Sequence, residues 1–177
     1  MSESPLQHWS WAQSVVRFTT VLPPSELVQG TRAVACHRDG RVAVCVDGDG
    51  RALLPGGTRE RDEPAEECLL RELAEEAGVL AASRPHWFAA HVGLSYHRVP
   101  YRDYAPFPLK AWLWGFVLID EVGQPRGSAD SSPEAETVSA VKFLPFDDAL
   151  EAVRDSPRGC ADALSQARGL ADAHCRY

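Results

Sequence analysis

Residues 57–79 read GTRERDEPAEECLLRELAEEAGV, and this stretch predicts a helix after a glycine-containing break. We expect the helix to run from about residue 63 to residue 77. Asp62 or Glu63 can cap its start, and Gly78 suits the left-handed backbone position after its end. The stretch therefore sets one helix in the first half of the chain.

Three glutamates gather on one face of this helix. At roughly 100° per residue, Glu72, Glu75 and Glu76 fall within an arc of about 100°, beside an apolar arc. Carboxylates at these spacings repel one another, and they sit in the last turn, where the helix macrodipole disfavours anions. Local stability does not explain the cluster, whereas Mg²⁺ would, because it takes carboxylate oxygens and bridges to substrate phosphates. A solvated acidic face is the alternative interpretation of these glutamates alone.

The complete spacing is more specific than the glutamates. Five residues separate the first glycine from a glutamate, and seven more lead to the Arg-Glu pair; the positions are Gly57, Glu63, Arg71, Glu72, Leu73, Glu75, Glu76, Gly78 and Val79. At every defined position this resembles the signature of the Nudix hydrolases, G-x5-E-x7-R-E-U-x-E-E-x-G-U, in which U is aliphatic. Ordinary amino-acid frequencies give a chance coincidence of roughly 10⁻⁸ to 10⁻⁷ over a chain of this length.

The resemblance implies an α/β fold, the Nudix-type α/β/α sandwich with a mixed sheet. It also implies Mg²⁺- or Mn²⁺-dependent hydrolysis of a diphosphate bond in a nucleoside diphosphate linked to another moiety, a small-molecule substrate. The implied metal ligands are the carboxylates of Glu72, Glu75 and Glu76, with help from the carbonyl oxygen of Gly57.

Further catalytic roles follow from the same resemblance. Glu63 would pair with Arg71 to fix the signature loop. A carboxylate must also take a proton from the attacking water, and in this family the base is sometimes a signature glutamate and sometimes a glutamate on a later loop. Glu134 and Glu136 are the candidates on such a loop, and we prefer Glu136.

The substrate is expected to contact the segment 95–110, which is rich in Tyr, His, Arg and Pro and is typical of a long functional loop. Its candidate substrate-binding residues, which would stack on a base or contact phosphates, are Tyr96, Arg98, Tyr101 and Lys110. Trp112 and Trp114 follow on an apolar run, and a place in the core is the alternative interpretation for both.

Composition and charge exclude several other classes. The chain has 177 residues, 45% of them hydrophobic, and a formal net charge of −7, which argues against binding to a nucleic-acid polymer. The longest apolar stretch, 111–119, is about half the length that a membrane-spanning helix needs, and the N-terminus has no signal-peptide pattern. Five cysteines without a C-x-x-C pair predict reduced thiols in a cytoplasmic protein.

Residues 1–30 are expected to form an N-terminal extension, and residues 31–177 the Nudix hydrolase domain with C-terminal helices. Apolar runs predict strands over 33–36, 42–46, 52–54, 86–94, 111–119 and 138–144, and helical composition covers 147–153 and 161–174. An edge strand over 14–21 would pair within the chain or swap between two copies of a homodimer.

Two function classes remain open at this point. The favoured class is a metal-dependent hydrolase, because every signature carboxylate is present. The alternative is a non-catalytic nucleotide-sensing Nudix module. An activity like that of isopentenyl-diphosphate isomerase would need a Cys and Glu set and extra metal-binding histidines that we do not find.

Overall fold

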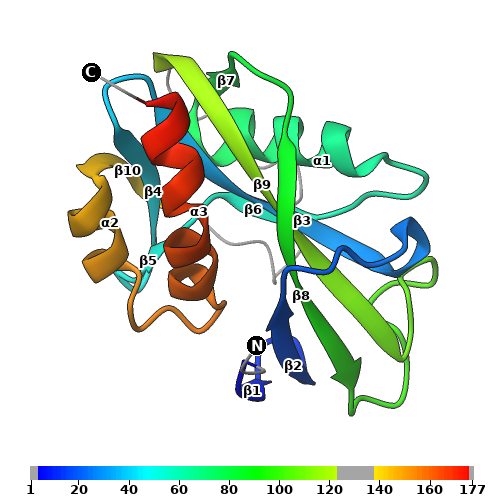
Figure 1. Cartoon of the computed structure of the whole chain (residues 1–177). Coiled ribbons are helices and arrows are strands. Elements are labelled where there is room, and N and C mark those ends of the chain that lie inside the picture. The colour runs from blue at the N-terminus through cyan, green and yellow to red at the C-terminus, as the bar shows by residue number, and fades with distance from the viewer. Residues whose placement is uncertain (1–3, 123–137, 176–177) are drawn as a thin grey trace.

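The computed structural model describes residues 4–122 and 138–175, and ten strands of the described chain form one mixed sheet with helices on both faces (Figure 1). The strands are β1 (Gln7–Trp9), β2 (Ser14–Thr19), β3 (Val28–His37), β4 (Arg41–Asp47), β5 (Ala52–Leu53), β6 (Gly56–Thr58), β7 (Val79–Ala81), β8 (His86–Ser95), β9 (Leu109–Val122) and β10 (Val138–Pro145). The helices are α1 (Ala65–Glu72), α2 (Phe146–Ala152) and α3 (Cys160–His174). Each strand and helix expected from the sequence has a counterpart here.

The sheet is open at the place where the signature begins. The strand order is β1-β2-β8-β9-β3-β4-β10, with β3 and β9 parallel and the other neighbours antiparallel. β3 meets β4 only at Cys36 and Val42, and β6 then pairs with the other end of β3, setting Gly57 opposite Thr31. The first loop of the signature therefore starts in the middle of the sheet.

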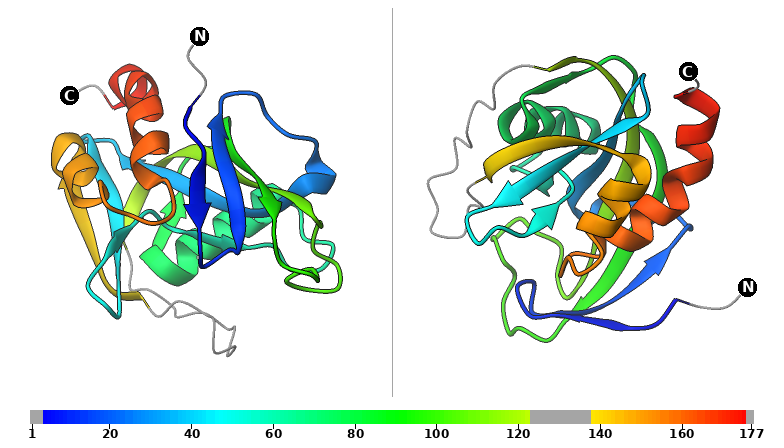
Figure 2. Two further views of the ribbon diagram at one scale, coloured as in Figure 1. Left: turned by 90° about the horizontal axis from the view of Figure 1, so that it is seen from below. Right: turned by 90° about the vertical axis from the view of Figure 1, so that its left-hand side faces the viewer.

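Two hydrophobic clusters fill the two sides of this sheet. Figure 2 shows α1 on one side of the sheet and α2 and α3 on the other. Along β3, Ala33 and Ala35 face α1, whereas Val34 and Cys36 face α2 and α3, as the alternation of a strand requires. Apolar residues of α1 and of the turn after it pack on the first side. The arrangement is an α/β/α sandwich, which confirms the predicted fold class. None of the described helices is long and apolar enough to span a membrane.

The N-terminal segment belongs to the same sheet. β2 pairs with β8 of its own chain, and β1 lies outside β2. The strand expected at the edge of the sheet is therefore the second strand from that edge. Trp9 and Val16 of this hairpin are buried with Trp112 of β9. β3 begins at Val28, so the expected boundary near residue 31 falls inside a strand.

For the signature helix, the expected end is confirmed and the expected start is wrong. Gly78 has φ 64°, the left-handed conformation expected after the helix. Between the end of α1 and Gly78, the chain forms a π-helical turn, Leu73–Ala77. At the start, the expected side-chain cap is wrong, because Pro64 occupies the cap position without a capping hydrogen bond. Asp62 instead has φ 60° in the preceding loop, and Glu63 bonds elsewhere.

Candidate active site

Arg71 joins three carboxylates of the signature. Its Nε lies 2.8 Å from Glu63 Oε1, and its Nη2 lies 3.0 Å from Glu63 Oε2. Its Nη1 lies 2.8 Å from Glu72 Oε1 and 3.2 Å from Glu75 Oε2, and Nη2 also donates to the carbonyl oxygen of Thr58. The planar guanidinium has enough fixed donors to serve all of these acceptors at once. Arg71 therefore ties the helix to the loop before it.

Glu63 is held as an anion in this network. Burial opposes its ionisation, but the hydrogen bonds from Arg71 and from the backbone N–H of Glu60 outweigh burial and lower its pKa. The ion pair between Glu63 and Arg71 that the resemblance implied is thus present in the structure. It fixes the conformation of the loop that carries Gly57 and Thr58.

Gly57 and Glu72 are in close contact. A Cβ atom added at Gly57 would lie 2.3 Å from Glu72 Oε1, far inside van der Waals distance, so the Glu72 carboxylate takes the space that a side chain would need. Glu72 itself is only 7% exposed. Burial raises its pKa, although Arg71 opposes the rise. Only glycine at position 57 allows this carboxylate to approach the loop backbone.

Glu76 is bound on the neighbouring part of the same loop. Its Oε2 accepts a hydrogen bond of 2.9 Å from the backbone N–H of Gly56. Burial, with repulsion from Glu72, raises the pKa of Glu76 to about 7. Gly56 has φ 145°, and a Cβ there would lie 2.2 Å from the carbonyl oxygen of Thr31. Two adjacent glycines thus bring loop backbone against two carboxylates of one helix.

The carboxylates fit a hard divalent cation by their chemistry. Glu72, Glu75 and Glu76 offer carboxylate oxygens, and burial raises the pKa of both Glu72 and Glu76, with repulsion from Glu72 adding to the rise at Glu76. Within the described residues, no group of three His, Cys, Asp or Glu side chains already surrounds one point. Arg71 binds two of the carboxylates and Gly56 the third, so a cation would compete with these partners.

The candidate substrate-binding residues have different surroundings. Tyr96 and Tyr101 are 58% and 42% exposed on the loop between β8 and β9, and Arg98 of the same loop is exposed. Lys110, by contrast, is 5% exposed and its Nζ lies 3.0 Å from the carbonyl oxygen of Ala12. Lys110 therefore has a structural contact with the N-terminal hairpin that its place at the end of a polar loop did not predict.

Two further expectations concern the same region and the chain after it. Trp112 and Trp114 are 2% and 0% exposed, so the interpretation that puts them in the core is right. Glu134 and Glu136, the candidate proton acceptors, lie outside the described residues.

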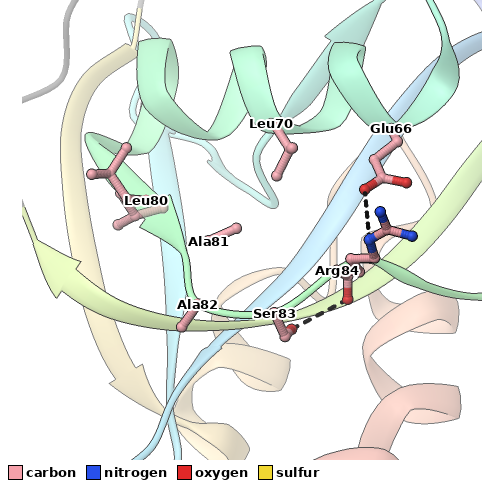
Figure 3. Close-up of a pocket in the computed structure, with 8 residues that line it drawn as sticks. Glu66, Leu70, Leu80, Ala81, Ala82, Ser83 and Arg84 are labelled. Atoms are coloured by element: carbon pink, nitrogen blue, oxygen red, sulfur yellow. Dashed lines mark hydrogen bonds and ion pairs between the residues drawn. The ribbon is translucent and has the colours of Figure 1, made fainter.

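A separate groove of about 530 Å³ lies between α1 and the segment that begins with β7 (Figure 3). Glu66 and Leu70 line it from the helix, and Leu80 and Arg84 line it from the other side. None of the three signature glutamates, Glu72, Glu75 and Glu76, is among the residues that line this groove. The groove is therefore not part of the carboxylate site.

Comparison with known proteins agrees with this geometry. The NUDIX domain family model matches residues 27–163. The structure is similar to the Bacillus subtilis pyrophosphohydrolase BsRppH in a mutant form, with a TM-score of 0.58 and 17% identity over 88% of this chain and 98% of that chain. It is also similar to the NUDIX domain of Shewanella oneidensis NrtR complexed with ADP ribose, with a TM-score of 0.57 and 21% identity over 81% of this chain and 87% of that one.

A third similar structure is the binary complex of a C. elegans Ap4A hydrolase, with a TM-score of 0.54 and 10% identity over 82% of this chain and 99% of that chain. At these identities the neighbours show a shared fold. A search of curated proteins gave no match. Because the family model covers more than half of the residues, the chain belongs to the Nudix family, as a hydrolase of the class that acts on phosphorus-containing acid anhydrides.

Proposed function

We propose that the protein hydrolyses a diphosphate bond in a nucleoside diphosphate linked to another moiety, with Mg²⁺ or Mn²⁺ as its cofactor. The observation that carries this proposal is the convergence of the signature carboxylates on Arg71 and on two glycines that have no room for a side chain. Such a site supplies anionic oxygens beside the loop backbone, which suits a metal-bound diphosphate.

Each residue has a defined task in this proposal. Glu72, Glu75 and Glu76 would hold the ion, together with the carbonyl oxygen of Gly57. When bound, the ion would neutralise charge on the diphosphate and lower the barrier to attack by water. Arg71 restrains the carboxylates of Glu72 and Glu75 in the absence of the ion. The water's proton goes to a carboxylate, for which Glu136 remains our prediction from the sequence.

The test is metal-dependent turnover of a panel of diphosphates. The panel contains ADP-ribose, NADH, dinucleoside polyphosphates, nucleotide sugars and nucleoside triphosphates, each with Mg²⁺ and with Mn²⁺. We expect Glu75→Gln to lower kcat by at least about 100-fold without changing the fold. The matched control is Glu67→Gln, on the exposed side of the same helix, which should keep wild-type turnover. Near-normal turnover by Glu75→Gln would contradict the assignment of metal ligands.

A non-catalytic nucleotide-sensing module is the second candidate. The similar NUDIX domain of Shewanella oneidensis NrtR was solved in complex with ADP ribose, so binding of that nucleotide is the first property to measure. A sensing module would bind ADP-ribose and turn over none of the panel. The intact set of signature carboxylates favours the enzyme.

We also propose a cytoplasmic setting and, as an expectation to be tested, a homodimer. All five cysteines are buried and free, which suits a reducing compartment. β2 pairs with β8 within the chain, so a dimer would not need a swapped N-terminal strand. Light scattering of the full chain over a range of concentrations tests the dimer, and a monomer mass at every concentration would refute it.

A further inference from the structure

Two cysteines that are 139 positions apart in the sequence lie side by side in the structure. Cys36 belongs to β3, Cys175 is the cap residue after α3, and their Sγ atoms are 2.7 Å apart. Both side chains are buried in the hydrophobic cluster on the α2 and α3 side of the sheet. The two sulfur atoms are therefore in contact, which is the first geometric condition for a covalent bond between them.

The other three cysteines have different surroundings. Cys45 packs in the cluster on the α1 side of the sheet. Cys68 and Cys160 each accept a hydrogen bond of 3.2 Å from a hydroxyl group. Within the described part of the chain, Cys36 and Cys175 are thus the one pair of thiols in hydrogen-bonding contact.

The two thiols of the pair differ in how readily they ionise. Burial raises the pKa of both. The hydrogen bond between them raises the pKa of Cys36 further and opposes the rise at Cys175, so Cys175 loses its proton more readily. The positive charge of Arg38 adds to this difference, because it favours the Cys175 thiolate.

Cys175 is also the thiol that a dissolved reagent reaches first. It is 5% exposed, whereas Cys36 is 0% exposed on a central strand. Helix ends fray, and local opening at the end of α3 would expose Cys175 while β3 stays in the sheet. Cys175 is therefore the attacking thiol, and Cys36 lies behind it.

We propose that Cys36 and Cys175 form a site of reversible oxidation by small disulfides, which joins α3 to β3 through an intrachain disulfide bond. The Cys175 thiolate attacks one sulfur of the small disulfide, forms a mixed disulfide and expels one thiolate. Cys36 then loses its proton, attacks Cys175 Sγ and expels the second thiolate. The two expelled thiolates take up the two cysteine protons, and the small disulfide gains the two electrons that the cysteines lose.

The bond would stabilise the fold at a distance from the carboxylate site. It constrains the unfolded chain over a long loop, and a disulfide typically raises the Tm of a chain of this size by about 4–16 °C. Thr31, the partner of Gly57, lies on the same strand as Cys36 but about 16 Å away along it. The modification is therefore independent of the proposed hydrolysis.

Peptide mapping of the full chain tests the site directly. The protein is incubated with excess oxidised glutathione, the remaining thiols are blocked with N-ethylmaleimide, and the chain is digested with trypsin. Each cysteine falls in a different tryptic peptide, and the pair falls in AVACHR (33–38) and GLADAHCR (169–176). We expect these two peptides to be joined, with the loss of two hydrogen atoms, and to separate again in dithiothreitol.

Variants assign the two sulfur atoms. Cys175→Ala should leave Cys36 as a free thiol, whereas Cys36→Ala should stop at the mixed disulfide between Cys175 and glutathione. Cys45→Ala is the matched control, because it removes a buried thiol from the neighbouring strand on the other side of the sheet. Oxidised glutathione should raise the Tm of the wild type and of Cys45→Ala by about 4–16 °C, and should not raise that of Cys36→Ala or Cys175→Ala.

Three results would overturn the proposal. The first is that peptides 33–38 and 169–176 of the wild type remain separate in oxidised glutathione. The second is a spread of cross-links over the other cysteines, and the third is an equal rise in Tm in Cys175→Ala. Because the readouts are peptide masses and melting temperatures, failure here is distinguishable from failure of the proposed hydrolysis.

Discussion

Replacing Gly57 by alanine would move the Glu72 carboxylate from its position beside the loop. The new Cβ would lie 2.3 Å from Oε1, 2.4 Å from Cδ and 2.7 Å from Oε2 of Glu72. Restoring ordinary contact requires a displacement of about 1 Å. The backbone at Gly57 is outside the left-handed region, so alanine adds crowding at the carboxylate without backbone strain.

The displacement has a calculable effect on stability and activity. It disrupts the 2.8 Å hydrogen bond between Arg71 and Glu72, and such charge-assisted bonds contribute about 1.5–3 kcal/mol. For a chain of this size the loss corresponds to a decrease in Tm of about 3–12 °C. A misplacement of about 1 Å in a catalytic group can lower the rate about 100-fold, so we expect a decrease of this order in kcat.

The assay compares Gly57→Ala with Gly48→Ala. No described atom lies within 4 Å of a Cβ built at Gly48, which makes it a glycine substitution without crowding. Thermal melts and Mg²⁺-dependent phosphate release should show losses for Gly57→Ala and none for Gly48→Ala. Wild-type kcat in Gly57→Ala, whatever its Tm, would refute the reasoning that the position of Glu72 against the loop matters for catalysis.

Three further perturbations probe the same network and the core beneath it. Arg71→Lys removes the planar fork that binds Glu63 through two bonds, so kcat and Tm should both decrease in steady-state assays and melts; unchanged values would contradict its role. Burial lowers the pKa of His91, although Asp162 opposes the shift. At a pH between the folded and the unfolded pKa, the imidazole is therefore protonated in the unfolded chain and neutral in the folded chain. The free energy of unfolding should therefore decrease below pH 6.5, by up to about 1.4 kcal/mol per pH unit, and urea titrations should find a shallower dependence in His91→Gln. Mg²⁺ at 100 times its Kd for the wild type should raise the free energy of unfolding of the wild type by about 2.7 kcal/mol. An equal increase for Glu75→Gln at the same Mg²⁺ concentration would show that the ion binds elsewhere.

The sequence predicts the part of the site that depends on local spacing. A helix period sets Glu72, Glu75 and Glu76 on one face, and the signature spacing brings Glu63 to Arg71 across a single loop. Apolar runs and turn residues likewise predict the order of strands and helices. These features depend on residues that are near one another in the chain.

The sequence pattern does not predict the contacts between segments that are far apart in the chain. Trp11, Arg32 and Arg158 meet only because the hairpin, β3 and the segment before α3 pack together, and a single arginine in an apolar strand gives no sign of this. Its place at the end of a polar loop predicts that Lys110 contacts the substrate, yet its hydrogen-bond partner is a carbonyl oxygen in the turn before β2. The missing helix cap is a local exception, because the Glu63 carboxylate binds Arg71 and not the first turn of the helix.

The most direct test of the proposed chemistry follows the oxygen of the attacking water. The best substrate of the panel is turned over with Mg²⁺ in water labelled with oxygen-18, and the phosphate-containing products are weighed by mass spectrometry. We predict one labelled oxygen per cleavage in one of the two products, and a rate at least about 100-fold lower in Glu75→Gln. Products without label, or labelling by Glu75→Gln at the wild-type rate, would contradict hydrolysis at the signature carboxylates.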